Sequence, residues 1–302
     1  MDNVSKPYHI PVLLNEVLSY LNIKPGGVYV DVTFGGGGHT RAILQADPTC
    51  QVIACDWDTV ALEKNGEPLK AEFGDRLTLI WGNFSQIDKH LKKIDVDEVD
   101  GILADFGTSF YQLTERPGFS FNKDTPLDMR MSPSHQKVTA SEIINKASEQ
   151  TFRDIFEKYG EEDRAKWVAR AIVEARKQKG IYTTKELTAV IEKVLGKPFG
   201  KKTHPATRVF QALRIYINKE LENIHSFLIS GMRALKPGGR LVCISFHSLE
   251  DRIVKQYFKE QESLGNVIIT PKVVIPTDEE IDRNPASRSA KLRVLEKDHN
   301  QD

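Results

Sequence analysis

The stretch Val28–Thr40, VYVDVTFGGGGHT, constrains the fold of this chain more than any other. A β-rich run ends at Asp31, the four glycines Gly35–Gly38 follow, and a helix-competent stretch begins immediately after them. Glycine lets the backbone approach a ligand closely, and the N-terminus of a helix supplies free N–H groups and a partial positive charge. A strand, a glycine turn and a helix in this order therefore predict a binding site for a nucleotide-like ligand, in preference to a flexible loop.

Two common nucleotide-binding loops are excluded by the residues around the glycines. The dinucleotide fingerprint G-x-G-x-x-G fails in both registers, because threonine or arginine stands where its third glycine is required. The phosphate loop of nucleoside triphosphatases fails as well, because no Gly-Lys-Ser/Thr follows. Asp31, Gly35 and Gly37 instead resemble motif I of class I S-adenosylmethionine (SAM) methyltransferases, in which an acid closes the first strand and G-x-G follows it.

The overall charge of the chain is balanced, with 42 Lys plus Arg against 42 Asp plus Glu in 302 residues. No global positive field therefore attracts nucleic acid, and any RNA contact must come from local basic patches. No apolar run is long enough to cross a membrane, and Met1–Pro7 lacks the core of a signal peptide. Cys50, Cys55 and Cys243 form no C-x-x-C pair and are predicted to be reduced core residues of a soluble cytoplasmic protein.

Three further apolar runs are predicted to be strands of the same sheet, at Gln51–Cys55, Leu77–Trp81 and Val99–Ala104. The first of them ends in Asp56, at the distance from the glycines where doubly wound folds place an acid that accepts hydrogen bonds from ribose hydroxyls. The alternative role for Asp56 is the N-cap of a helix that begins near Thr59.

Two more candidate residues follow the other strands. Phe84, after the third strand, could stack on adenine or belong to the core. Asp105 directly follows the fourth strand. Because the carboxyl ends of parallel strands meet at one edge of a sheet, Asp31, Asp56 and Asp105 are expected to converge there.

The alternation of strands and helices stops after Gly107 and resumes after Asn218. Four helical runs are predicted between these points, at Ala140–Ala147, Glu149–Tyr159, Glu161–Lys179 and Thr184–Leu195. The sheet pattern then returns as a helix, a buried strand, a second helix and two closing antiparallel strands, at Glu220–Leu235, Arg240–Phe246, Ser248–Gln261, Val267–Ile275 and Ala290–Glu296. We therefore predict an α/β protein with the Rossmann-like doubly wound sheet of class I SAM-dependent methyltransferases. The sheet domain comprises 1–108 and 219–302, and the inserted all-helical domain, 109–218, is predicted to recognise the substrate.

Motifs along almost the whole chain, from about His9 to Arg293, resemble one family, the bacterial ribosomal RNA small-subunit methyltransferase H family. The motifs are HIPVLLNEVL, DVTFGGGGHT, GFSF, PLDMRM, HPATRVFQALRI, ISFHSLEDRIVK and NPASRSAKLR. This resemblance implies methylation of the exocyclic N4 of a cytidine in the decoding centre of 16S rRNA, with SAM as methyl donor. The SAM contacts that it implies fall on Gly37, Gly38, His39, Asp56, Phe84, Asp105 and Gln112.

The chain departs from the family pattern beside the expected site of methyl transfer. The usual D-L-G-V-S-S-x-Q-L-D appears here as the run DFGTSFYQLT, from Asp105 to Thr114, and the loop that follows is one residue short. Because of these departures, the family pattern does not fix the shape of the target pocket or the efficiency of methyl transfer in this chain.

Methylation at an exocyclic nitrogen is the chemistry that the residues favour. The N4 lone pair of cytosine is delocalised into the ring, so an enzyme must hold acceptors at its N–H groups and align the nitrogen with the donor. Asp105 could accept from the target amine or from the SAM amino group, and the family pattern favours the SAM role. Methylation at C5 would require a nucleophilic cysteine, usually after proline, and no cysteine here follows proline.

The sequence also offers candidates for substrate binding. His247, after the fifth strand, is expected either to approach the target base or to be a hydrogen-bonded structural histidine. The basic residues that form either an RNA surface or simply a solvated charged face fall in two clusters: Lys197, Lys201, Lys202, His204, Arg208 and Arg214, and then Arg283, Arg288, Lys291 and Arg293. Arg208 and Arg214 lie six positions apart on one helix and share no face, so one of them is a candidate for a structural role. No histidine pair has the spacing of metal ligands, and no metal site is predicted.

Two other functions remain open at this point. One is a methyltransferase for another nucleic acid, and the other is a ribosome assembly factor that binds SAM and RNA with weak or no catalysis. The predicted partner is 16S rRNA or the small ribosomal subunit. The sequence leaves the oligomeric state open, a homodimer included.

Overall fold

The computed structural model describes residues 10–107, 116–197 and 204–299. The chain forms two compact units, which we call the sheet unit (Met1–Ser109 and Leu221–Asp302) and the helical unit (Phe110–Glu220). The assignment of substrate recognition to an inserted domain, 109–218, remains a proposal. None of the helices in the described ranges is both long and apolar enough to span a lipid bilayer.

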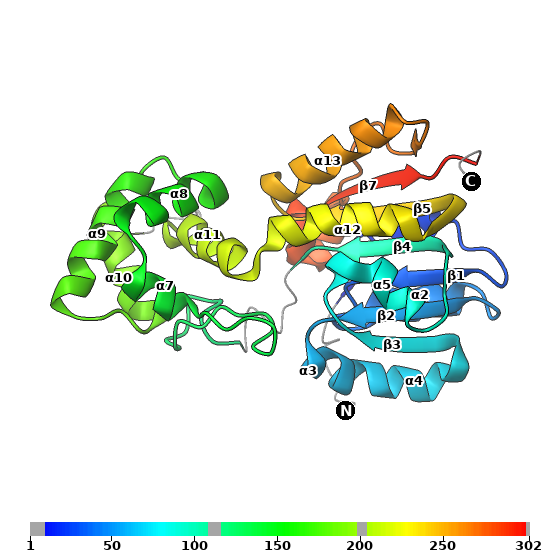
Figure 1. Cartoon of the computed structure of the whole chain (residues 1–302), viewed down its shortest axis with the longest axis horizontal. Helices are drawn as coiled ribbons and strands as arrows, with labels where there is room; N and C mark the ends of the chain where they lie inside the picture. The colour runs from blue at the N-terminus through cyan, green and yellow to red at the C-terminus, as the bar shows by residue number, and fades with distance from the viewer. Residues whose placement is uncertain (1–9, 108–115, 198–203, 300–302) are drawn as a thin grey trace. The chain divides into compact units, whose positions relative to one another are not determined.

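The sheet unit contains a seven-stranded sheet in the order β3-β2-β1-β4-β5-β7-β6 (Figure 1). Strands β1 to β5 are parallel, and β7 runs antiparallel to both of its neighbours, β5 and β6. Their bounds are Val28–Asp31 (β1), Gln51–Asp56 (β2), Leu77–Trp81 (β3), Val99–Asp105 (β4), Leu235–Ser245 (β5), Val267–Ile268 (β6) and Lys291–Glu296 (β7). The strand order reverses between β1 and β4, and this is the fold of class I SAM methyltransferases, as the sequence predicted.

Helices cover both faces of the sheet because side chains alternate along each strand. Val30 belongs to the core that the sheet shares with α5 (Ile87–Lys92), α12 (Glu220–Ala234) and α13 (Ser248–Glu262). Its neighbour Tyr29 belongs to the opposite core, which α1, α2 and α4 complete. The remaining helices of this unit are α1 (Leu14–Leu21), α2 (Gly38–Ala46), α3 (Thr59–Ala61), η1 (Leu62–Gly66), α4 (Glu67–Phe73), η2 (Gly74–Arg76), η3 (Phe84–Gln86), α14 (Asp278–Arg283) and η4 (Pro285–Ser289).

One predicted strand is much shorter than expected. Of the run Val267–Ile275, only Val267–Ile268 pairs with β7 as a strand. Pro271 interrupts the run, and proline has no backbone N–H to donate to a neighbouring strand. Val274 returns to the sheet as an isolated bridge to Leu292.

The helical unit contains α7 (Ala140–Lys146), α8 (Glu149–Gly160), α9 (Ala165–Gln178), α10 (Thr184–Leu195) and α11 (Ala206–Asn218). Capping boxes begin two of them. Thr139 caps α7 together with Glu142, and Thr183 caps α10 together with Glu186. These helices are amphipathic, and their apolar side chains, Phe152 among them, are buried, so the unit has a core of its own.

Candidate functional site

Three carboxylates lie at the carboxyl edge of the parallel sheet. Asp31, the last residue of β1, is in register with Ala54 of β2 and Leu103 of β4. Asp56 and Asp105 end those two strands, so each stands two residues further along its strand. The sheet thus brings together the acids that the sequence predicted to converge, at the point where the strand order reverses.

Hydrogen bonds fix the glycine loop to the neighbouring strands. The N–H of Gly35 donates to Oδ2 of Asp56 at 2.8 Å, and Asn65 donates through Nδ2 to the carbonyl of Gly35 at 2.9 Å. Thr33 accepts a hydrogen bond through Oγ1 from the N–H of Asp105 at 2.7 Å. The loop after β1 is therefore attached to the ends of both β2 and β4.

The alternative role for Asp56 as a helix N-cap is wrong. The cap of α3 is Asp58, whose side chain accepts from the N–H of Val60 at 3.1 Å. Asp56 accepts instead from two backbone N–H groups, those of Gly35 and Asp58. A carboxylate can accept further hydrogen bonds through its remaining lone pairs, so Asp56 can also bind hydroxyl groups. Burial raises the pKa of Asp56 to about 6, against the effect of its two backbone hydrogen bonds.

Asp31 stabilises the site without being available to a ligand. Its side chain is 1% exposed and accepts from the hydroxyl of Thr40 at 2.7 Å and from the N–H of Thr33 at 3.1 Å. Burial raises the pKa of Asp31, while the nearby His39 opposes this effect. The acid of motif I therefore joins the end of β1 to the first turn of α2.

His39 and Asp105 form a buried pair at this edge. The His39 ring lies with Nε2 2.9 Å from the carbonyl of Val12 and Nδ1 3.9 Å from Oδ2 of Asp105. Asp105 also accepts from the N–H of Gly107 at 3.2 Å. Burial raises the pKa of Asp105 to about 6, with His39 lowering it and the neighbouring Asp31 raising it. Reasoning from residue types alone missed His39, because no local pattern predicts its approach to the end of β4.

Phe84 belongs to an aromatic cluster beside these acids. Its ring centroid lies 5.6 Å from that of Phe227, 6.0 Å from that of Phe106 and 6.4 Å from that of Trp57. Phe227 is fully buried, whereas Phe84 keeps part of its surface accessible. Phe84 therefore packs against the core and still presents an aromatic surface near the end of β3, so both roles considered for it remain compatible with its position.

The predicted substrate-binding residues of the sheet unit have different surroundings in the structure. His247 is the N-cap of α13, where it accepts a hydrogen bond from the N–H of Glu250. Arg288 is exposed in η4. Arg293 is partly buried, with 13% of its side chain exposed, and forms an ion pair with Asp251 in which Nε lies 2.7 Å from Oδ1, so its guanidinium is already engaged.

The basic residues of the helical unit that are candidates for RNA binding also differ in their surroundings. Arg214 binds Glu220 through two nitrogens at 2.9 Å and is structural. Arg208 is exposed and donates to the carbonyl of Glu161 at 3.0 Å. His204 packs on Phe121 and accepts from the N–H of Ala206 at 3.1 Å. Three predicted site residues lie outside the described residues: Gln112, Lys201 and Lys202.

Residues 6–298 of the chain match the sequence model of one protein family, described as the MraW methylase family. The chain belongs to this family. Relatives named "Ribosomal RNA small subunit methyltransferase H" align over almost their full lengths. The protein from Desulfotalea psychrophila is 48% identical, with 96% of this chain and 98% of that protein covered. The protein from Carboxydothermus hydrogenoformans is 44% identical, with 96% and 97% covered.

The methyl donor of this methylase is SAM, and the edge formed by β1, β2 and β4 fits it. A Cβ atom at Gly37 would lie 2.9 Å from the ring of Phe34, so the loop packs as it does only with glycine there. Asp56 retains acceptor capacity for two adjacent ribose hydroxyls. Asp105 ends β4, on the other side of β1 from Asp56, and Phe84 presents an aromatic surface near the end of β3.

We expect Gly37→Ala to weaken SAM binding by about tenfold, because Gly37 has φ +73° and its Cβ would collide with Phe34. Gly35→Ala is the matched control, since Gly35 also has a positive φ, +48°, but the nearest atom to its Cβ lies 3.8 Å away. Calorimetric titration of both variants with SAM separates the effect of backbone strain on affinity from the effect of the collision with Phe34. Equal affinities for the two variants would show that the collision has no effect.

SAM affinity is expected to fall by about tenfold for each acid when the pH is lowered from about 7 to about 5. The folded pKa values of Asp56 and Asp105, about 6, lie above the value of 3.8 for a free aspartate. The protonated form therefore persists in the free protein up to about pH 6, and a ligand that requires the carboxylate must first displace the proton. Titrations across this range in Asp56→Asn should show a weaker pH dependence than in the wild type.

Proposed function

We propose that the protein transfers a methyl group from SAM to the exocyclic N4 of a cytidine in the decoding centre of 16S rRNA. The observation that carries the proposal is the convergence of Asp56, Asp105 and the glycine loop at one sheet edge in a chain that aligns end to end with ribosomal RNA small-subunit methyltransferases. The motifs that the chain shares with this family favour N4 of cytidine as the acceptor.

SAM supplies a methyl group that is bound to a positively charged sulfur. When the methyl group is transferred, the electrons of the broken carbon–sulfur bond stay on sulfur. The residues of the chain must hold the donor, exclude water and orient the target nitrogen. Asp56 and the Gly35–Gly38 loop are proposed to hold the adenosine part, and Asp105 the amino group. His39, 3.9 Å from Asp105, is proposed to stabilise its ionised form when the donor is bound.

The cysteines argue against methylation at carbon C5 of cytosine. That reaction requires a thiolate nucleophile that can reach the base. Cys50, Cys55 and Cys243 are all buried, and burial raises the pKa of each thiol. The chain therefore offers no accessible thiolate, which supports a nitrogen as the acceptor.

The decisive experiment is transfer of labelled methyl from SAM to small ribosomal subunits purified from cells that lack this modification. We expect incorporation into 16S rRNA, and nucleoside analysis by mass spectrometry should identify N4-methylcytidine. Label in 5-methylcytidine or in another RNA would overturn the proposed acceptor. SAM binding with no incorporation would favour the assembly-factor function instead.

Charge reversal at Lys201 and Lys202 is expected to weaken binding to 16S rRNA. Loss of two cations that contact phosphates should also flatten the dependence of affinity on salt, by about 0.7 in logarithmic slope for each contact. The Lys201→Glu, Lys202→Glu protein should bind SAM like the wild type. An unaltered salt slope would remove these lysines from the RNA-binding surface.

A further inference from the structure

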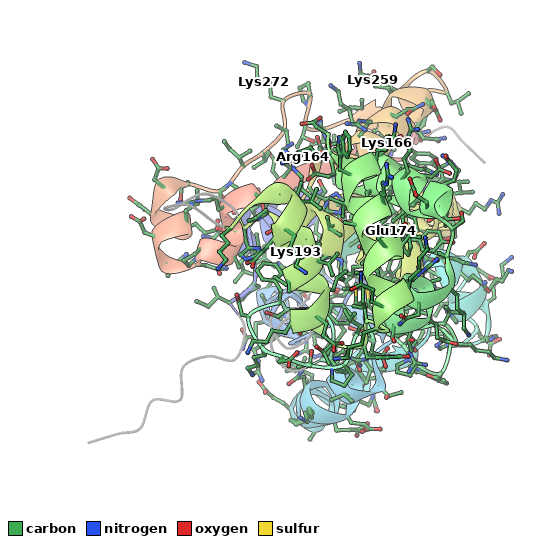
Figure 2. All side chains as sticks on the ribbon, turned by 90° about the vertical axis from the view of Figure 1, so that its left-hand side faces the viewer. Arg164, Lys166, Glu174, Lys193, Lys259 and Lys272 are labelled. Carbon is green, nitrogen blue, oxygen red and sulfur yellow. The ribbon has the colours of Figure 1, made fainter. Side chains whose placement is uncertain are left out.

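The exposed face of α9 carries a tryptophan among basic side chains. Trp167 exposes 58% of its surface, although tryptophan side chains are usually largely buried. Arg164 and Arg170 lie three residues before and after it, so they flank the indole along the same face of the helix, and Lys166 is exposed beside them. We call these four residues the α9 surface. Figure 2 shows Arg164 and Lys166 near one end of the helix and Glu174 further along it.

The cations of the α9 surface have few acidic neighbours within the helix: Glu174, one turn after Arg170, is near enough for Arg170 to lower its pKa. The first turn of α9 contains no acid, although the helix macrodipole favours negative charge there. Within the described part of the chain, no carboxylate forms an ion pair with Arg164, Lys166 or Arg170. Some exposed cations of the same unit are paired with acids, as Lys177 is with Glu174 at 2.8 Å.

This combination of side chains fits single-stranded RNA better than a protein. Aromatic residues at the centre of protein interfaces are surrounded by residues depleted in charge. The exposed neighbours of Trp167 along α9 are charged instead, Glu174 and Lys177 included. Surfaces that bind single strands combine an aromatic ring, on which a base stacks, with cations that contact the flanking phosphates. Of the three acids that precede the α9 surface, Glu162 is buried, so its three exposed cations stand beside two exposed acids, Glu161 and Asp163.

We propose that the α9 surface binds a single-stranded segment of the RNA substrate. An unpaired base stacks on the indole of Trp167, and the phosphates on either side of it are held by Arg164, Lys166 and Arg170. The inference rests on the proposed function for the identity of the RNA. It adds to that function a second contact, made by residues other than those of the glycine-loop site.

Binding of a fluorescein-labelled oligouridylate of about twelve nucleotides, followed by fluorescence anisotropy, tests the stacking contact. Trp167→Ala should weaken binding by about tenfold, and Trp167→Phe should retain most of the affinity because phenylalanine also stacks. Tyr182→Ala is the matched control, since Tyr182 is an equally exposed aromatic of the same unit, at 59%. Thermal unfolding should be similar for all variants, because both side chains are exposed.

The salt dependence of binding separates stacking from charge. Lys166→Gln with Arg170→Gln should lower the logarithmic salt slope by about 1.4, whereas Trp167→Ala should leave the slope unchanged. Lys146→Gln with Lys177→Gln removes two cations that pair with acids, and it should have little effect. Wild-type affinity in Trp167→Ala would overturn the proposal. Equal binding of a matched duplex would overturn the stacking contact, because paired bases cannot stack on the indole.

The outcome can be separated from that of the methylation experiment. Methyl transfer by the wild-type protein, together with unchanged RNA binding and transfer in Trp167→Ala, would refute the α9 surface alone. Absence of transfer, together with RNA binding that depends on Trp167, would refute the proposed activity and leave this RNA contact in place. A protein partner that depends on Trp167 while RNA binding does not would also overturn the proposal.

Discussion

Asp105→Asn is expected to weaken SAM binding by about 1.5–3 kcal/mol, or about 10- to 100-fold, and to reduce methyl transfer at subsaturating SAM to the same extent. Asparagine has nearly the shape of aspartate and can still accept from the N–H of Gly107. It cannot form a charge-assisted hydrogen bond with the donor's amino group. The measurement is calorimetric affinity for SAM alongside initial rates of transfer.

Asp251→Asn provides the control for Asp105, because Asp251 is also a half-buried acid of the sheet unit but pairs with Arg293. That variant should lose stability without a selective loss of SAM affinity. A normal affinity in Asp105→Asn together with slow transfer would assign Asp105 to the target amine instead of the donor. Normal values for both would exclude Asp105 from the site.

Asp56→Ala is expected to weaken SAM binding by about 1–3 kcal/mol, which is the cost of leaving buried ribose hydroxyls without an acceptor. The substitution also removes the acceptor for the N–H of Gly35, at 2.8 Å, so the glycine loop should become less ordered. Calorimetry with adenosine and with 2′,3′-dideoxyadenosine separates the two effects, since only adenosine carries the ribose hydroxyls.

Asp58→Asn is the control for Asp56. Asparagine remains a good N-cap for α3, and the substitution removes a second acid two residues away in the chain. It should leave SAM affinity close to that of the wild type. Unchanged affinity in Asp56→Ala would refute its ribose role.

Much of the fold follows from local sequence signals. The segment from β1 through the glycine loop to α2 was predictable, because a strand that ends in an acid and is followed by glycines and a helix is typical of a binding site for a nucleotide-like ligand. Strand β3, Leu77–Trp81, was predicted with its observed bounds. The helix Thr184–Leu195 was also predicted with its observed bounds, and Thr183 and Glu186 form its capping box. The length of β6 was not predictable from apolar content alone, because the run continues past the residue at which pairing stops.

The site was less predictable than the fold, because its geometry depends on contacts between distant segments. Nothing near His39 in the sequence indicates that its ring lies between the carbonyl of Val12 and the carboxylate of Asp105. The same holds for Arg293, which was one candidate for an RNA surface and is paired with Asp251. The chemical type of a residue suggests what it can bind, and only tertiary structure determines whether it is already occupied.

The insertion of the helical unit has a consequence for the order of folding. β4 and β5 are central neighbours in the sheet, yet the whole helical unit lies between them in the chain. Helices form through contacts between residues close in sequence, which is fast, whereas pairing of distant parallel strands must wait for a long loop to close. The pairing of β4 with β5 is therefore expected late in refolding, after the inserted helices have formed, whereas β1, β2 and β4, which carry the three acids, all precede the insertion.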